Sequence, residues 1–191
     1  MRTAEVNWKT LETEVHVKVN LDSVGKADIQ TGIAFLDHLI ATLALHGLID
    51  IELSVKGDLK HHITEDVSIC LGQAIRKALG DGDGITRFGF AIVPMGGSLA
   101  FSAVDLAKRP HAKVNLKLAG ERVEDMPCED IHHFFETLAM SMQASIHIWT
   151  LYGDNDHHKA EAAIKALALS LKQAIAVDSR RKSAPSVKGV I

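Results

Sequence analysis

The chain has 191 residues, of which 47% are hydrophobic, so it can form one domain or two small fused ones around a buried core. Its formal net charge of −3 gives no general basic surface, which excludes nucleic acid as the expected partner. No run of about 18 apolar residues occurs, and residues 1–10 lack the apolar stretch of a signal peptide, so we expect neither a membrane span nor an export signal.

The first half of the chain alternates predicted strands with predicted helices. Residues 14–21 alternate polar and apolar side chains, which predicts a half-buried strand, and residues 22–31 are expected to form a loop. Apolar side chains at helical spacing predict a helix over 33–46, and residues 49–56 alternate again as a strand. After a short turn, the pattern predicts a helix over 61–79.

The second half is predicted to begin with three strands, over residues 85–93, 98–106 and 112–118. Gly96-Gly97 marks the hairpin turn between the first two of them. Residues 119–129 are polar and are expected to form a connection without regular structure.

A helix over 130–144, a strand over 145–151 and a long helix over 157–177 complete the predicted elements. Asp156 is the expected N-cap of the last helix, because a short carboxylate can accept hydrogen bonds from its first turn. The basic tail, residues 178–191, has two interpretations: it is mobile, or it folds over a bound phosphate.

One short pattern, H-H-x-x-E, occurs twice, at residues 61–65 and 157–161. On a helix, residues three or four apart share a face, so each glutamate can point the same way as one of its histidines. Neighbouring residues lie about 100° apart around a helix, so the two histidines of a pair can serve two different points. The doubled pattern therefore suits two metal ions better than one, whereas its alternative is two surface pairs that arose by chance.

A lone histidine precedes each pair, His38 in F-L-D-H-L and His133 in H-H-F-F-E. The copies are offset by 133 − 38 = 95 residues at one end and by 161 − 65 = 96 at the other, half of the 191-residue chain. The simplest account is an internal duplication. Each half then offers a lone histidine on a helix, a strand, and H-H-x-x-E at the start of a second helix, which together suffice for two sites of three histidines and one glutamate.

Four further side chains have both a functional and an ordinary interpretation. His46 ends a predicted helix, where an imidazole also stabilises the helix dipole. Arg87 and Arg109 are either solvated or form an anion clamp, since the planar guanidinium matches phosphate oxygens. Lys165 lies seven residues beyond His158 and near its face, and its alternative is a solvated lysine.

Taken together, F-L-D-H-L, H-H-x-x-E-D, T-R-F-G, R-P, H-F-F-E, N-D-H-H-K-A-E-A-A-x-K-A and P-S-x-K-G-V closely resemble the motifs of the imidazoleglycerol-phosphate dehydratase family of histidine biosynthesis over nearly the whole chain. The resemblance implies an internally duplicated α+β fold (ribosomal protein S5 domain 2-like) whose two similar halves pack their helices between two sheets. We divide the chain into half-repeats 1–83 and 84–177 and a substrate-contacting tail, 178–191. The resemblance also implies a homo-oligomer, a hollow particle of 24 subunits with sites between subunits. Cys70 and Cys128 lie in unrelated contexts, which fits a reduced, cytoplasmic protein.

The resemblance implies two Mn²⁺ ions per active site. The implied metal ligands, which the duplication also singles out, are His38, His61, His62, Glu65, His133, His157, His158 and Glu161. The implied substrate contacts are Glu12, His38, His46, His61, His62, Arg87, Arg109, His157, Lys165, Ser186 and Lys188. Two stretches depart from the family pattern: Leu59-Lys60 replaces a segment that usually ends in two aspartates, and Val187 replaces a Thr or Ser.

The implied reaction is the manganese-dependent loss of water from imidazoleglycerol phosphate, a small phosphate substrate, to give imidazole acetol phosphate, which makes the protein a hydro-lyase. The proton removed is not next to a carbonyl, so we expect two metals on the ring nitrogens to stabilise an imidazolate that expels the hydroxyl through a diazafulvene-like intermediate. Glu12 is the expected catalytic proton shuttle. Imidazole and carboxylate ligands suit manganese but leave zinc, iron and cobalt open.

Two other classes compete with this interpretation. A dinuclear metallohydrolase would use a metal-bound water as its nucleophile. A metal-storage protein of the four-helix di-iron class would carry Glu-x-x-His on long helices, whereas strands interleave with the predicted helices here.

Overall fold

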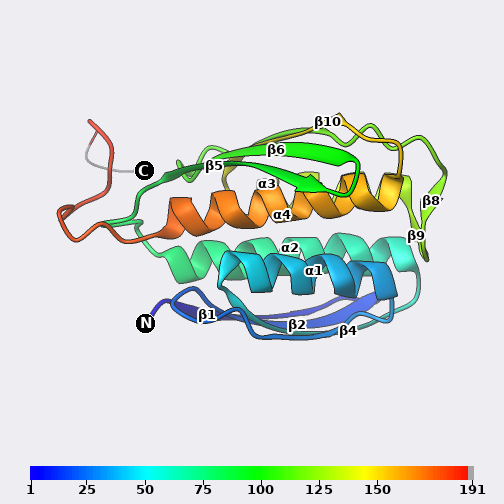
Figure 1. The fold of residues 1–191 in the computed structure, drawn as a ribbon. Coiled ribbons are helices and arrows are strands. Elements are labelled where there is room, and N and C mark those ends of the chain that lie inside the picture. Colours follow the sequence, from blue (N-terminus) through cyan, green and yellow to red (C-terminus); the bar gives the residue numbers. More distant parts are fainter. Residues whose placement is uncertain (189–191) are drawn as a thin grey trace.

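Over residues 1–188, which the computed structural model describes, four long helices lie between two four-stranded sheets (Figure 1). The α+β class and the arrangement of helices between two sheets are thus confirmed. Residues 189–191 of the predicted tail lie outside the described residues. No helix in the described part of the chain is long and apolar enough to cross a membrane.

The first half forms one sheet and two helices. Its elements are β1 (Thr3–Lys9), β2 (Thr13–Asn20), β3 (Ala27–Gln30), α1 (Ala34–Gly47), β4 (Asp50–Gly57) and α2 (Lys60–Leu79), with sheet order β1-β2-β4-β3. The predicted strands at β2 and β4 and both predicted helices are confirmed. The alternation in β2 buries Val15, Val17 and Val19 against the helices, each at most 2% exposed.

The second half repeats this arrangement. Its elements are β5 (Phe88–Met95), β6 (Ser98–Asp105), β7 (His111–Asn115), α3 (Cys128–Ser141), β10 (Ser145–Tyr152) and α4 (Asp156–Ile175), with sheet order β5-β6-β10-β7. In the first sheet β4 pairs with the edge strand β3 in parallel, and in the second sheet β10 pairs with β7 in the same way. The other pairings are antiparallel. The one addition is a short hairpin, β8 (Arg122–Val123) and β9 (Met126–Pro127), between β7 and α3.

The helices pair across the two halves rather than within them. α1 packs against α4, and α2 packs against α3, over the part of the chain that the structure describes. Fully buried leucines and phenylalanines fill the layer between the sheets, including Leu36, Leu71 and Phe134. This pairing places each lone-histidine helix beside the H-H-x-x-E helix of the other half.

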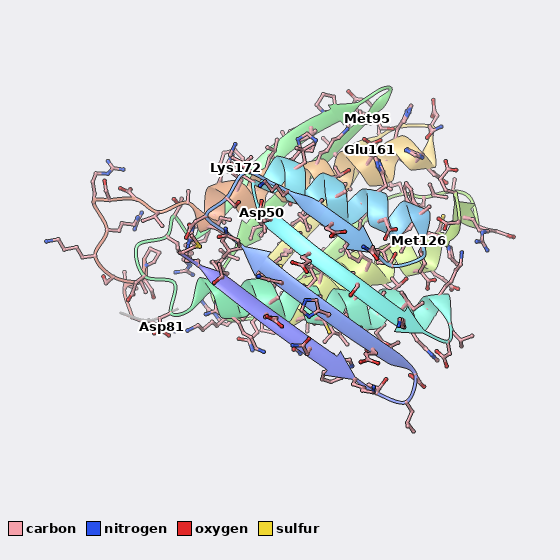
Figure 2. All side chains as sticks on the ribbon, turned by 90° about the horizontal axis from the view of Figure 1, so that it is seen from below. Asp50, Asp81, Met95, Met126, Glu161 and Lys172 are labelled. Carbon is pink, nitrogen blue, oxygen red and sulfur yellow. The ribbon has the colours of Figure 1, made fainter. Side chains whose placement is uncertain are left out.

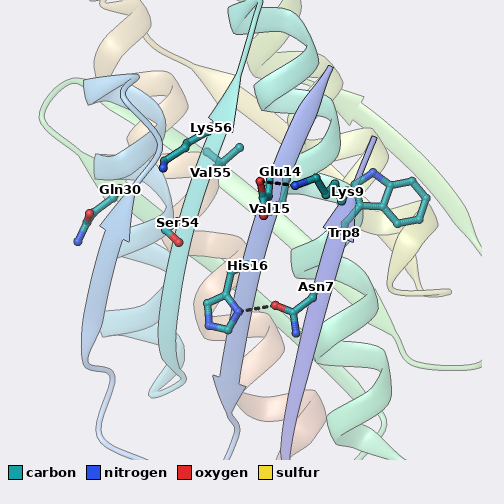
Figure 3. A pocket seen from close by; sticks show the side chains of 10 residues that line it. All are labelled: Asn7, Trp8, Lys9, Glu14, Val15, His16, Gln30, Ser54, Val55 and Lys56. Carbon is teal, nitrogen blue, oxygen red and sulfur yellow. Dashed lines mark hydrogen bonds and ion pairs between the residues drawn. The ribbon is translucent and has the colours of Figure 1, made fainter. Parts of the chain in front are cut away.

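The outer faces of the two sheets differ in chemistry although their topologies match. On the first sheet, seen face-on in Figure 2, a row of paired residues is charged: Glu5, Lys18, Glu52 and Asp28. This face also carries a shallow hollow of about 540 Å³, in which His16 Nδ1 lies 2.8 Å from Asn7 Oδ1 (Figure 3).

The outer face of the second sheet is apolar over three of its strands. Ile92 pairs with Phe101, Phe101 pairs with Trp149, and only the edge strand β7 adds a polar residue to this row, Asn115. Phe90 and Ile92 are 68% and 60% exposed, which is unusual for large apolar side chains that lie side by side.

Several predicted boundaries were wrong. The strands β1 and β3 were not predicted, and the connection over 119–129 contains the hairpin β8–β9. The N-cap of α4 is Asn155, whose Oδ1 accepts the His158 N–H at 2.9 Å, whereas Asp156 is the first helical residue.

The start of β5 was also predicted too early, at residue 85 instead of Phe88. The backbone N–H groups of Thr86 and Arg87 donate to the carbonyls of Ala176 and Ala174 at the end of α4, and Arg87 has a positive φ of 75°. The chain therefore turns around the end of α4 before the strand begins.

Candidate metal centre

The first cluster consists of His38, His157 and Glu161. His38 projects from α1, whereas the other two lie four residues apart on the first turns of α4. His38 Nε2 lies 3.7 Å from Glu161 Oε1, and His157 Nε2 lies 3.4 Å from Glu161 Oε2. One ligand atom of each residue lies within 4.8 Å of the others, so the three can reach a single metal ion.

The second cluster consists of His61, Glu65 and His133. The first two lie four residues apart on α2, and His133 projects from α3. His133 Nε2 lies 3.6 Å from Glu65 Oε1, and the His61 and His133 rings stack with centroids 5.2 Å apart. The ligand atoms again lie within 4.8 Å of one another, so both clusters combine two histidines with one glutamate.

Carboxylates contact the far side of three of the paired histidines. Asp130 Oδ1 lies 2.6 Å from His61 Nδ1, and Glu124 Oε1 lies 3.1 Å from His157 Nδ1. An ionised carboxylate only accepts hydrogen bonds, so Nδ1 carries the proton and the lone pair of Nε2 faces the cluster. This arrangement is typical of metal-binding histidines, so the residues present fit a metal ion.

Asp58 is the carboxylate beside the third histidine, His62, with its Oδ1 2.8 Å from Nδ1. The hydrogen bond raises the pKa of His62 and lowers that of Asp58. Sequence reasoning missed the roles of Asp58, Asp130 and Glu124. For Asp58 a signal existed, because it lies four residues before His62 and so one helical turn away.

His62 and His158 lie outside both clusters in the part of the chain that the structure describes. His62 Nδ1 lies 3.7 Å from Glu12 Oε2 in the loop between β1 and β2. His158 lies against the tip of the β5–β6 hairpin, where a Cβ added at Gly96 would lie 2.7 Å from its Nδ1. His132 does not join a cluster either, and its Nε2 contacts the carbonyl of Val114 at 3.0 Å.

Lys165 and His46 extend the first cluster along α4 and α1. Lys165 Nζ donates to Glu161 Oε1 at 2.7 Å. Burial raises the pKa of Glu161, but the hydrogen bond and charge of Lys165 lower it by more, so the net shift of this pKa is downward. Burial, and then the Lys165 charge, lower the pKa of His46, which favours its neutral form.

The start of β5 and the C-terminal tail, the segments with most of the remaining predicted substrate contacts, lie at the opposite end of the helices (Figure 1). The Arg87 guanidinium donates two hydrogen bonds to Asp105, at 2.7 and 3.1 Å, and a third to the carbonyl of Pro185 at 2.9 Å. Arg109 follows the strand that Asp105 ends. The tail residues Ser186 and Lys188 continue from Pro185, and Lys188 N–H donates to Ser186 Oγ at 3.2 Å.

The separation of the two ends follows from helix geometry. Arg87 N–H bonds to Ala174 near the C-terminus of α4, whereas His157 lies at its N-terminus. At a rise of about 1.5 Å per residue, these positions on α4 are about 25 Å apart. A single chain therefore does not bring its own arginines and tail to its own histidine clusters.

Comparisons with known proteins all point to one family. The sequence profile described as imidazoleglycerol-phosphate dehydratase matches residues 31–171. Curated relatives with that name include one from Dehalococcoides mccartyi strain CBDB1, 45% identical over 191 residues and covering 100% of this chain and 97% of the relative. Another, from Methylorubrum extorquens, is 43% identical and covers 99% of each chain.

Solved structures agree with the sequence comparisons. The Staphylococcus aureus imidazoleglycerol-phosphate dehydratase superposes with a TM-score of 0.85 at 27% identity, over 92% of this chain and 99% of that one. The Pyrococcus furiosus protein superposes with a TM-score of 0.82 at 34% identity, over 97% of this chain and 100% of that one.

Proposed function

The chain belongs to the imidazoleglycerol-phosphate dehydratase family, and from this we propose that it removes water from imidazoleglycerol phosphate to give imidazole acetol phosphate in histidine biosynthesis. It is a dehydratase, and so a hydro-lyase. The free thiols of buried Cys70 and half-buried Cys128 support a location in the reducing cytoplasm.

The observation that carries the proposal is the pair of matched clusters. Each has two histidines and one glutamate, and each draws residues from both halves of the chain. A surface pair of histidines that arose by chance would have no reason to meet a third ligand from the other half. It would also have no reason to carry carboxylates on Nδ1, as His61 and His157 do.

We propose that the bound metal is Mn²⁺, with two ions per active site. Imidazole and carboxylate ligands suit this hard, oxygen- and nitrogen-binding cation. When bound, the ions supply Lewis-acid character and a template for the imidazole ring of the substrate. The residues that would hold them are His38, His61, His62, Glu65, His133, His157, His158 and Glu161.

We propose further that the active site is completed by other copies of the chain, in a homo-oligomer of 24 subunits. Two observations support this. His62 and His158 lie outside both clusters among the described residues, and the segments with the arginines and tail lie about 25 Å along α4 from the histidines. The exposed apolar row around Phe90 and Ile92 offers a surface on which copies can associate.

The side chains of this protein would divide the work of the reaction among themselves. Glu12, which lies beside His62, would move a proton between the substrate side chain and solvent. Lys165 and His46 would bind the substrate next to the first cluster. The phosphate would be held by donors at the other end of the helices, namely Arg87, Arg109, Ser186 and Lys188.

The test is an assay of the purified protein with imidazoleglycerol phosphate, before and after chelation. We expect loss of water in the presence of Mn²⁺, no turnover after the metal is removed, and recovery when Mn²⁺ returns. A protein that instead hydrolyses simple phosphate esters would be the rival metallohydrolase. Bound metal without either activity would support the storage interpretation.

A further inference from the structure

The hairpin β8–β9 is the one element that the duplication does not repeat, and it lies at the end of the molecule where the histidine helices begin (Figure 1). Its two-residue turn is Glu124-Asp125. Neither residue belongs to the metal-ligand set or to the substrate contacts that the family resemblance implies. The contacts of this hairpin therefore have no counterpart in the first half of the chain.

The duplication offset shows that the two clusters are supported differently. Asp130, which contacts His61, lies three residues before His133 on α3. Three residues before His38 on α1 stands Phe35, and the offset agrees because 130 − 35 = 95. The Phe35 ring packs against His157, with centroids 5.1 Å apart, but offers no hydrogen-bond acceptor. His157 must therefore find its carboxylate elsewhere.

Glu124 supplies that carboxylate from the tip of the hairpin. Its Oε1 lies 3.1 Å from His157 Nδ1, and its backbone adopts a positive φ of 51°. The Glu124 side chain is 61% exposed, whereas that of Asp130, beside His61, is only 5% exposed. Water therefore competes for the contact at His157 far more than for the contact at His61.

Asp125 fixes the hairpin in place. Its carboxylate accepts the N–H groups of Ala34 and Phe35, at 2.8 and 2.9 Å, and so caps α1, whose own N-cap residue provides no side-chain bond. Its carbonyl also accepts from Lys60 Nζ at 3.2 Å. These bonds hold the turn against α1, so the fold fixes the backbone position of Glu124 beside His157.

We propose that Glu124 is a positioning residue for His157, and that the first cluster releases its metal ion before the second. Glu124 holds the proton on His157 Nδ1, so that Nε2 presents its lone pair to the ion. Two features weaken the first cluster relative to the second: the exposed support of His157, and the Lys165 ammonium 2.7 Å from the ligand Glu161. The proposal rests on the proposed metal-dependent function.

The experiment measures metal release from the assembled, Mn²⁺-loaded protein. Wild type and variants are equilibrated with increasing concentrations of a chelator, and bound manganese per chain is determined by elemental analysis. For wild type we expect two release steps. Glu124→Ala should move the earlier step to a chelator concentration lower by about 10–100-fold and leave the later step in place. In Glu124→Gln the amide oxygen can still accept a hydrogen bond from Nδ1, so its earlier release step should lie between those of wild type and Glu124→Ala.

A matched control lies on the same segment. Glu121 is an exposed carboxylate three residues away, and its backbone carbonyl, not its side chain, bonds to Cys128. Glu121→Ala removes the same charge and should leave both steps at their wild-type positions. Asp130→Asn should move the later step instead.

Three outcomes overturn the proposal. The first is that Glu124→Ala releases both ions as wild type does. The second is that it moves only the later step, and the third is that Glu121→Ala has the same effect as Glu124→Ala. A dehydratase assay on the same wild-type preparation separates this proposal from the proposed function. If wild type is active but Glu124→Ala releases its metal as wild type does, only the role of Glu124 is wrong. If Glu124→Ala shifts metal release but wild type does not dehydrate the substrate, only the proposed function is wrong.

Discussion

His38 Nε2 and Glu161 Oε1 lie 3.7 Å apart, although one comes from the first half of the chain and the other from the second. The counterpart atoms, His133 Nε2 and Glu65 Oε1, lie 3.6 Å apart, and here the histidine comes from the second half and the glutamate from the first. The lone histidine of each half thus meets the glutamate of the other half's H-H-x-x-E pattern. This exchange follows from the pairing of α1 with α4 and of α2 with α3.

Replacement of Glu65 by Gln should remove one of the two metal ions from each chain. Glu65 is the only carboxylate of the second cluster, and a neutral amide is a weaker metal ligand. Because the Glu65 side chain is 44% exposed, the change should cost little folding stability. Elemental analysis measures the metal content, and a thermal melt of the chelated protein measures the folding stability. Two retained ions would exclude Glu65 from the ligand set.

Replacement of Glu12 by Gln should lower kcat by about 10²–10⁴, the usual contribution of a group that transfers a proton. Metal content should stay at the wild-type value, since Glu12 is outside both clusters and is not among the proposed metal ligands. Glu14→Gln is the control, because Glu14 is an exposed neighbour that pairs with Lys9 on the outer face of the first sheet. A variant at position 12 with near-normal turnover would remove Glu12 from the reaction.

Stability should fall at acid pH partly through Asp125. Burial raises the pKa of Asp125, but the N–H groups of Phe35 and Ala34 and the Lys60 charge lower it more, so the folded pKa lies below the ordinary value of an aspartate. A group whose folded pKa is lowered stabilises the protein above its unfolded pKa, and this contribution is lost as pH falls through the folded value.

Asp125→Asn should therefore lower stability at pH 7 by about 0.5–2 kcal/mol, as expected for loss of a cap, and its effect should shrink as the pH falls below the ordinary range of a carboxyl group. Denaturant unfolding of the chelated protein across this range measures the difference. An equal loss of stability at pH 7 and at low pH would show that the charge of Asp125 is not what caps α1.

Gly89→Ala should destabilise the fold by about 1–3 kcal/mol or more, because the added methyl group overpacks the contact between β5 and α4. A Cβ at this position would overlap the carbonyl oxygen of Ser170, a backbone atom that cannot rotate away. Gly97→Ala is the control, since nothing lies within 4 Å of its added Cβ. Thermal melts of the two variants should differ clearly, and equal melting temperatures would contradict the close packing of β5 on α4.

Charge placed on the outer face of the second sheet should break up the assembly. Ile92→Asp buries a carboxylate if copies associate through this face, whereas Ser54→Asp makes the same change on the polar face of the first sheet. Native mass spectrometry should show smaller particles for the first variant only. If both variants keep the wild-type mass, the apolar row is not a contact between copies.

The helical spacing of H-H-x-x-E and the 95-residue offset singled out the six residues that gather at the clusters, but they also singled out His62 and His158, which lie outside both clusters over the described residues. They gave no information about which lone histidine meets which pair, because that depends on how α1 and α4 pack against each other. The carboxylates at Asp130 and Glu124 were missed for the same reason: their histidine partners lie 69 and 33 residues away. Local patterns cannot report such contacts.

The strands β1 and β3 were missed for different reasons. In β1 apolar Ala4, Val6 and Trp8 alternate with polar residues, so a strand signal is present in the sequence and was overlooked, although only Val6 is buried. The four residues of β3, Ala27–Gln30, form the edge of the sheet beside β4, where little apolar burial is needed. With four residues, β3 is too short to show the periodicity by which the other strands were recognised.

The exchange of ligands between halves has a consequence for origins. An ancestor of half this length would have carried every ligand type. With the exchange seen here, its lone histidine would have met the glutamate of a second copy, so it would have captured a cation as a two-fold symmetric dimer. Fusion into one polypeptide removed the need for the two partners to find each other. It also released the two sides from identical selection, and Phe35 in the first half now stands at the position that Asp130 occupies in the second.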